Sequence, residues 1–180
     1  MTRDEALALV QSQVTNRNLI KHMLATEACM RRLAKHFSED VELWGLTGLL
    51  HDLDYDQTAK DFARHGLLSA EMLAGKVDER VVYAIKAHPG HVPAVSQLDK
   101  ALYAVDPITG LIVASALMAP EKKLANVDRA FVLRRYKEKK FAAGANREQI
   151  ASCAQLGLSL DDFTEMCVEA MKGIALDLGL

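Results

Sequence analysis

Apolar residues recur at intervals of three and four along most of this chain, and no stretch alternates cleanly with a period of two. A spacing of three and four places apolar side chains on one face of an α-helix, whereas a half-buried strand needs strict alternation. The pattern therefore predicts an all-α protein, a bundle of eight or nine helices. Half of the residues are apolar and only four are prolines, which suits such a bundle.

The length of 180 residues fits one domain, 1–180, and the sequence contains no linker, repeat or low-complexity tract. A capping box of Thr2 and Glu5 predicts a short first helix. Ser38 is expected to cap the third helix, and Pro107 is expected to kink a later one. The helices after the first are predicted at about 18–37, 39–50, 62–74, 78–87, 99–118, 120–141, 147–157 and 160–179.

Charge and cysteine content narrow the class of protein. A formal net charge of −2 gives no support for binding to nucleic acid or to a membrane surface. The longest apolar stretch, Leu111 to Ala119, is too short to span a bilayer, and no signal peptide is apparent. Cys29, Cys153 and Cys167 lack C-x-x-C spacing and are expected to be buried free thiols, which indicates the cytoplasm.

The histidines are concentrated in the first half of the chain. All six lie within the first 91 residues, and none lies in the last 89. His51 and Asp52 are adjacent at the end of an apolar helix, and His22 lies in the middle of a helix suited to the core. A buried neutral imidazole needs a partner for both ring nitrogens, and a metal ion supplies one. The pattern predicts a metal site built from histidine and carboxylate.

The order and spacing of His22, His51–Asp52 and Asp106 resemble the HD superfamily, which is named for its His–Asp doublet. The chain is similar to the HDIG type over about residues 18–115, and the helices at 120–180 are an extension. The resemblance implies an HD-domain-like helical bundle in which these four side chains bind a divalent metal ion.

Further positions follow from the same resemblance. His65 and His88 stand where binuclear members of the superfamily supply histidines for a second ion, so both are expected ligands. Asp54 occupies the position of the HDIG glycine. The chain also lacks the GYP element of the cyclic-dinucleotide phosphodiesterases, which disfavours that subclass. Imidazole and carboxylate ligands without thiolate suit one or two ions of Mn, Fe, Co, Ni, Zn or Mg.

Carboxylates near the doublet are candidates for the chemistry. Asp52 is expected to ligate the metal and to orient the attacking water. Asp54, Asp56 and Glu27 are candidates for the general acid or base, and nothing in the sequence selects among them.

Several cations are candidates for substrate binding. Arg64 and Lys86 lie beside His65 and His88 and are predicted to contact a phosphate group. A basic segment over 121–140 is better explained as a solvated helix face, although Arg134 and Arg135 are candidates within it. His36 suits a helix C-terminus and His91 a loop.

The resulting prediction is a metal-dependent phosphohydrolase that acts on a small phosphorylated metabolite or nucleotide through a metal-bound hydroxide. Two alternatives remain: a di-iron oxygenase of the same superfamily, and a nucleotide-sensing module without turnover. The apolar runs around Leu111 and Val132 are interpreted as core or as a subunit contact, so a homodimer is compatible with the sequence. No partner other than a small phosphorylated substrate is predicted.

Overall fold

The structure is a computed structural model that describes residues 1–180. It contains α-helices and short 3-10 helices but no β-strand, so the predicted all-α class is confirmed, and nine of the α-helices have five residues or more. The α-helices are α1 (Arg3–Gln13), α2 (Arg17–Phe37), α3 (Val41–Leu50), α4 (Tyr55–Thr58), α5 (Leu67–Leu73), α6 (Glu79–Ala87), α7 (Gln97–Met118), α8 (Arg129–Lys137), α9 (Arg147–Ala151), α10 (Leu160–Lys172) and α11 (Ala175–Leu178). The 3-10 helices are η1 (Phe62–Arg64), η2 (Pro120–Lys122), η3 (Leu124–Asn126) and η4 (Ser152–Leu156).

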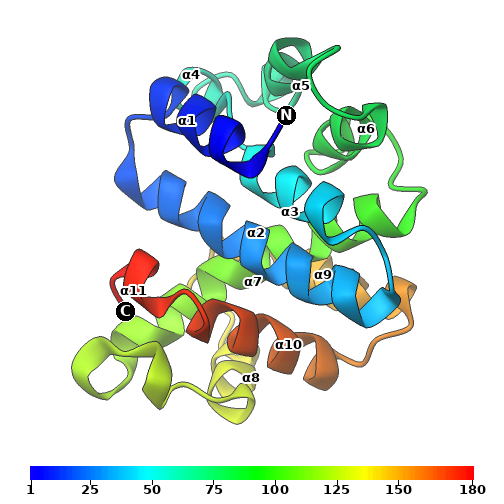
Figure 1. Cartoon of the computed structure of the whole chain (residues 1–180). Coiled ribbons are helices and arrows are strands. Elements are labelled where there is room, and N and C mark those ends of the chain that lie inside the picture. The colour runs from blue at the N-terminus through cyan, green and yellow to red at the C-terminus, as the bar shows by residue number, and fades with distance from the viewer.

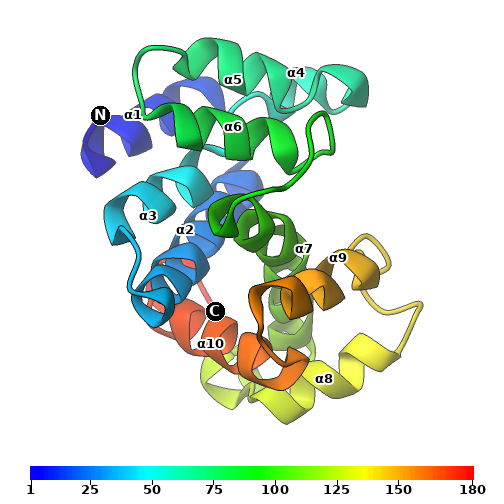
Figure 2. The same cartoon turned by 90° about the vertical axis from the view of Figure 1, so that its right-hand side faces the viewer.

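The two longest helices, α2 and α7, form the centre of the molecule, and the other helices pack around them (Figure 1). In the second view, α4, α5 and α6 lie at one end, and α8, α9 and α10 lie at the other (Figure 2). A continuous core of 43 buried apolar residues extends from Ala6 in α1 to Leu178 in α11. In this core α2 packs against α3 and α7, and α6 packs against the same two helices, so side chains from all four can reach one place.

The local sequence determines where helix α2 begins and ends and which of its faces is buried. Its first N–H groups are capped by the side chain of Asn16, and Met23 and Leu33 are fully buried on its inner face. It ends at Ser38, whose φ of 57° is left-handed. The prediction that Ser38 caps the next helix is therefore wrong, and Asp40 caps α3 with its side chain.

The helix predicted over 62–74 is interrupted between η1 and α5. Gly66 lies at the break with a φ of +77°, and a Cβ there would lie 2.8 Å from the carbonyl oxygen of Ile85. Only glycine tolerates both the left-handed backbone and the close approach. The break places His65 in a turn and directs its side chain toward α6.

The helix predicted over 120–141 is shorter in the structure, where only α8 is α-helical in this range. Pro120 follows the end of α7 and begins the turn η2. Glu121 and Lys122 then adopt left-handed φ angles of 57° and 54°, which end regular helix. The segment between α8 and α9 consists of turns.

Helix α3 approaches α2 closely at its glycines. A Cβ on Gly48 would lie 2.8 Å from the backbone nitrogen of Glu27, and a Cβ on Gly45 would lie 2.5 Å from Arg31 Nε. A larger residue at Gly48 would meet backbone, which cannot move as a side chain can. This contact fixes the end of α3, where His51 lies.

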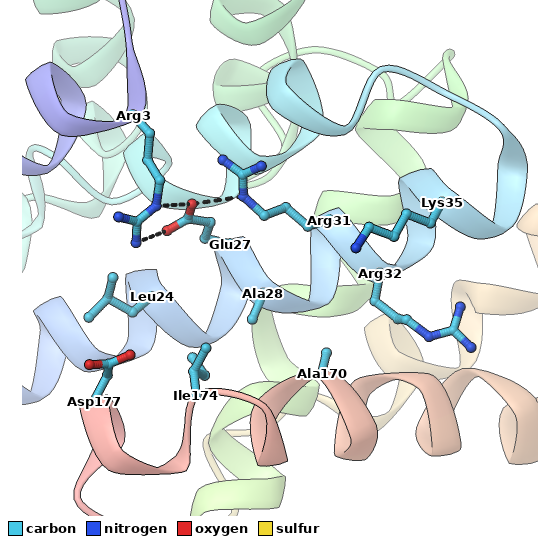
Figure 3. A pocket seen from close by; sticks show the side chains of 10 residues that line it. All are labelled: Arg3, Leu24, Glu27, Ala28, Arg31, Arg32, Lys35, Ala170, Ile174 and Asp177. Atoms are coloured by element: carbon cyan, nitrogen blue, oxygen red, sulfur yellow. Dashed lines mark hydrogen bonds and ion pairs between the residues drawn. The ribbon is translucent and has the colours of Figure 1, made fainter.

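A chain of ion pairs joins the first three helices, and Figure 3 shows its part between Arg3 of α1 and Glu27 and Arg31 of α2. The carboxylate of Glu27 is only 3% exposed. It accepts hydrogen bonds from Arg3 Nε at 2.7 Å, Arg3 Nη2 at 3.0 Å and Arg31 Nε at 2.9 Å. Arg31 in turn donates to Glu42 of α3 at 2.6 Å. Glu27 therefore serves to hold α1 against α2.

Helix α7 is the one helix with the length and composition of a membrane span. Of the apolar stretch of this helix that has the composition of a membrane span, 56% is buried inside the protein. Leu102, Ile108 and Ile112 are fully buried. The core of the bundle thus accounts for its apolar character. The helix continues through Pro107, which has no N–H to offer the carbonyl group of Tyr103.

We predict that Gly48→Ala destabilises the protein by about 2 kcal/mol, because the added methyl group forces α3 away from the α2 backbone. Gly110→Ala in α7 is the matched control. No atom lies within 4 Å of the Cβ it adds, so it should be neutral or stabilising by about 0.5–1 kcal/mol. Urea unfolding followed by circular dichroism measures both. Equal stability of Gly48→Ala and wild type would contradict the close contact.

Candidate metal centre

Six histidine and aspartate side chains that were predicted as metal ligands converge on one place. They come from separate elements and are brought together only by the packing of α2, α3, α6 and α7. The set is His22 in α2, His51 at the end of α3, Asp52 directly after it, His65 after η1, His88 at the end of α6, and Asp106 in α7.

Three of these side chains form a first group. His22 Nε2 lies 3.2 Å from His51 Nε2 and 3.1 Å from Asp106 Oδ1. His51 Nε2 lies 3.8 Å from the same oxygen. Ligand atoms of the three residues all lie within 4.8 Å of one another, close enough to share one ion.

The second group lies on the other side of Asp52. His65 Nε2 and His88 Nε2 are 3.0 Å apart, and Asp52 Oδ1 lies 3.4 Å from the first and 3.5 Å from the second. Asp52 Oδ2 lies 3.5 Å from His22 Nε2 in the first group. Asp52 Oδ1 also lies 3.4 Å from His51 Nε2, so the carboxylate of Asp52 contacts histidines of both groups and joins them into one cluster.

Each of the four histidines has an outer partner for its Nδ1 atom. His51 Nδ1 contacts the carbonyl oxygen of Gly48 at 2.8 Å, and His88 Nδ1 contacts that of Ile85 at 2.6 Å. His22 Nδ1 lies 2.9 Å from Thr109 Oγ1, and His65 Nδ1 lies 2.9 Å from Asp54 Oδ1. Carbonyl and carboxylate oxygens can only accept. The Thr109 hydroxyl already donates to the carbonyl of Asp106 at 2.8 Å, so it accepts as well.

These partners assign the tautomer of each neutral ring. Every Nδ1 atom carries the proton, so every Nε2 atom presents a lone pair toward the centre. Four such lone pairs and two carboxylates in one small volume repel one another unless a positive charge lies between them. Outer hydrogen bonds of this kind are also what orients histidine ligands in metal sites. The donor set therefore fits one or two divalent cations.

The pKa values of His51, Asp52 and Asp106 also indicate a site that requires positive charge. Burial lowers the pKa of His51, but Asp52 and Asp106 beside it raise the pKa further, to about 9. Burial would raise the pKa of each carboxyl group, yet the neighbouring histidines hold both pKa values well below the ordinary range. Before a cation binds, a proton on His51 supplies part of the charge that these carboxylates need.

Asp54 lies behind the centre and does not line the cavity. Its carboxylate is fully buried and accepts hydrogen bonds from His65 Nδ1, the Gly66 N–H at 2.8 Å and the Ser69 N–H at 2.9 Å. The structure therefore places this predicted catalytic residue as a positioning residue for His65. His91, predicted as a loop residue, assists it, because its Nε2 contacts the His65 carbonyl oxygen at 2.8 Å.

The other two candidates for the general acid or base are also engaged elsewhere. Glu27 is held by Arg3 and Arg31 on the outer side of α2. Asp56 accepts hydrogen bonds from the backbone N–H and the hydroxyl of Thr15 at 2.7 and 2.8 Å. Neither residue lines the cavity that contains the ligands.

Five of the six candidate ligands line a cavity of about 1080 Å³, and the sixth, His51, is fully buried beside them. Asp52 and Asp106 are the only acidic side chains that line it, and Lys21 is its only lysine or arginine. Arg64 and Lys86, which were predicted to contact a phosphate, are not among its lining residues, and neither are Arg134 and Arg135. Arg64 and Lys86 are close in sequence to His65 and His88, but their side chains do not line the cavity that contains the two histidines. Lys21 was missed, although it is adjacent to His22 in the sequence.

Comparison with known families gives one match. The HD domain family matches residues 19–117, which is more than half of the chain and includes all six ligand positions. Comparison with curated proteins and with solved structures gave no significant match.

We predict that each group of ligands holds its own ion. His22→Ala should remove the ion of the first group and His88→Ala that of the second, each with at least a tenfold loss of affinity, as expected for a lost ligand. Elemental analysis after equilibration with Mn²⁺ measures both. His36→Ala, an exposed histidine on α2, is the control and should leave the metal content unchanged. If both ligand variants retain the wild-type content, the assignment is wrong.

We also predict that metal affinity rises with pH. The cation binds the deprotonated form of His51, whose pKa is raised to about 9, so binding releases a proton at lower pH. Between pH 6 and 8 the apparent affinity for Mn²⁺ should increase about tenfold per unit. Calorimetry in buffers of different ionisation enthalpy measures both the affinity and the proton release. An affinity independent of pH over this range would contradict the prediction.

Proposed function

Because this chain belongs to the HD domain family, whose members are generally metal-dependent phosphohydrolases, we propose that it hydrolyses a phosphate ester of a small metabolite or nucleotide. The observation that supports this most directly is Asp52, whose carboxylate lies within 3.5 Å of the Nε2 atoms of His22, His51, His65 and His88. Two divalent cations held by such a cluster would stabilise the attacking and the leaving oxygen of a phosphoryl group together.

The ligand set leaves coordination positions for water and substrate. The second group offers His65, His88 and one oxygen of Asp52, fewer ligands than a closed structural site would have. Divalent cations bound here supply Lewis acidity, which lowers the pKa of a water molecule and neutralises charge on phosphate. Nitrogen and oxygen donors without thiolate suit Mn, Fe, Co, Ni, Zn or Mg.

The protein's own groups orient the reactants. Asp106 has a side chain that is 30% exposed toward the cavity, so its outer oxygen can accept a hydrogen bond from water. Asp54 holds His65 as a fixed ligand and increases its basicity. With no further carboxylate in the cavity, the proton for the leaving oxygen comes from solvent or from the hydroxyl groups of Tyr55 and Tyr103, which line the cavity.

One observation favours a second candidate, a di-iron oxygenase of the same superfamily. The full set of six ligands, divided into two groups around one carboxylate, would also suit two iron ions. The cavity also contains a single lysine, fewer cations than many phosphate sites have. Iron content and oxygen consumption separate the two functions, because hydrolysis consumes no oxygen.

We place the protein in the cytoplasm on the basis of its thiols. Cys29, Cys153 and Cys167 are free and buried. Burial raises the pKa of Cys153 and Cys167, which keeps both in the unreactive thiol form. Free thiols are the rule in a reducing compartment.

The test is a panel of phosphorylated metabolites and nucleotides, assayed with the full chain after each metal ion has been restored in turn. Wild type should release inorganic phosphate with at least one metal, and His51→Ala should lose both its metal and its activity while its circular dichroism stays helical. His36→Ala should behave as wild type. A helical, metal-loaded protein that binds nucleotides but releases no phosphate would favour the sensing module over the enzyme.

A further inference from the structure

Lys21 carries an uncompensated charge at the metal cavity. It precedes His22 on α2, lines the cavity and forms no ion pair with any carboxylate of the chain. Gly179 lies beside it, and a Cβ at that position would be 3.1 Å from Lys21 Nζ. Glycine therefore leaves space for the ammonium group. A half-buried ammonium without a partner is available to an anionic ligand.

The charge of the cavity matches one phosphate group. Two divalent cations exceed the charge of Asp52 and Asp106, and Lys21 adds to this excess. A phosphomonoester carries a charge of about −1.5 to −2 at neutral pH, which would neutralise most of this excess. A nucleoside triphosphate places two further phosphates beyond the centre. The cavity offers them no second lysine and no arginine.

The polar rim of the cavity is uncharged. Asn16 and Asn146 cap α2 and α9 through Oδ1, which leaves their Nδ2 groups free to donate. The side chains of Asn18 and Gln149 make no hydrogen bond within the protein, and both line the same cavity. Carboxamides recognise hydroxyl and carbonyl groups and add no charge. This rim suits an organic group that is polar but not ionised.

The remaining wall is apolar. Leu19, Val113 and Leu117 line the cavity beside the carboxamides, and Phe62 lies near its mouth, 5.2 Å between ring centroids from His65. Contact with this wall favours the carbon skeleton of a ligand over a chain of phosphates.

We propose that the cavity selects a phosphomonoester with an uncharged, hydroxyl-bearing organic part, and that Lys21 pairs with its phosphate group. Nucleoside di- and triphosphates are poor substrates. The proposal rests on the phosphohydrolase function proposed above and assigns its substrate class and an anchoring residue.

The first experiment measures binding rather than turnover. The Mn²⁺-loaded full chain is titrated with methylphosphonate, a non-hydrolysable mimic of a phosphomonoester, by calorimetry at pH 8. Lys21→Met should weaken binding about tenfold, the usual effect of one lost charge-assisted hydrogen bond, without changing the Mn²⁺ content. Lys35→Met is the matched control, because Lys35 lies on the same helix but outside the cavity, and it should bind as wild type. Wild-type affinity in Lys21→Met overturns the role of Lys21.

The second experiment compares phosphate release from sugar and polyol phosphomonoesters with release from nucleoside triphosphates. Faster release from the monoesters, with a raised KM in Lys21→Met, supports the proposal. Faster release from triphosphates overturns the substrate class but leaves the phosphohydrolase function intact. No release from either class overturns the function itself, and the calorimetry then decides separately whether Lys21 binds an anion.

Discussion

The centre depends on a set of hydrogen bonds that point away from it. Four Nδ1 atoms are each held by an oxygen from the surrounding structure, two of them backbone carbonyls within the same helix. These contacts turn all four Nε2 lone pairs inward, so the fold itself creates a concentration of negative potential that a cation relieves. An isolated imidazole would choose either tautomer. Here helix geometry makes the choice for His51 and His88, since the carbonyl three residues earlier lies directly beside Nδ1.

The sequence predicts a large part of this arrangement. Helical periodicity predicts the all-α class, because apolar spacing is a local property that packing preserves. The His51–Asp52 doublet, with His22 and Asp106, is identifiable because ligands of this type have few other reasons to lie in core helices. The structure brings His65 and His88 to the same centre.

Other features depend on contacts between distant segments and could not be predicted. The break at Gly66 arises because the carbonyl of Ile85 approaches it, and no local pattern reports that approach. Adjacency in sequence was misleading for Arg64 and Lys86, because neighbours on a helix or turn point in different directions. Lys21, which is adjacent to His22, was not predicted and does line the cavity. Asp54 is an acidic residue of the kind that often acts in catalysis. It is buried behind His65, however, and positions that side chain.

The HD region alone does not enclose the cavity. Gly144, Asn146 and Gln149, together with residues 178–180, line it from outside the matched range of 19–117. Arg147 holds this part of the wall in place: its guanidinium donates to the carbonyls of Phe141 at 2.6 Å and Ala145 at 2.6 Å, which order the loop before α9. The candidate metal ligands all lie in the matched range, whereas part of the cavity wall comes from the C-terminal segments. Substitutions in the C-terminal segments can therefore change the cavity wall without replacing any candidate metal ligand.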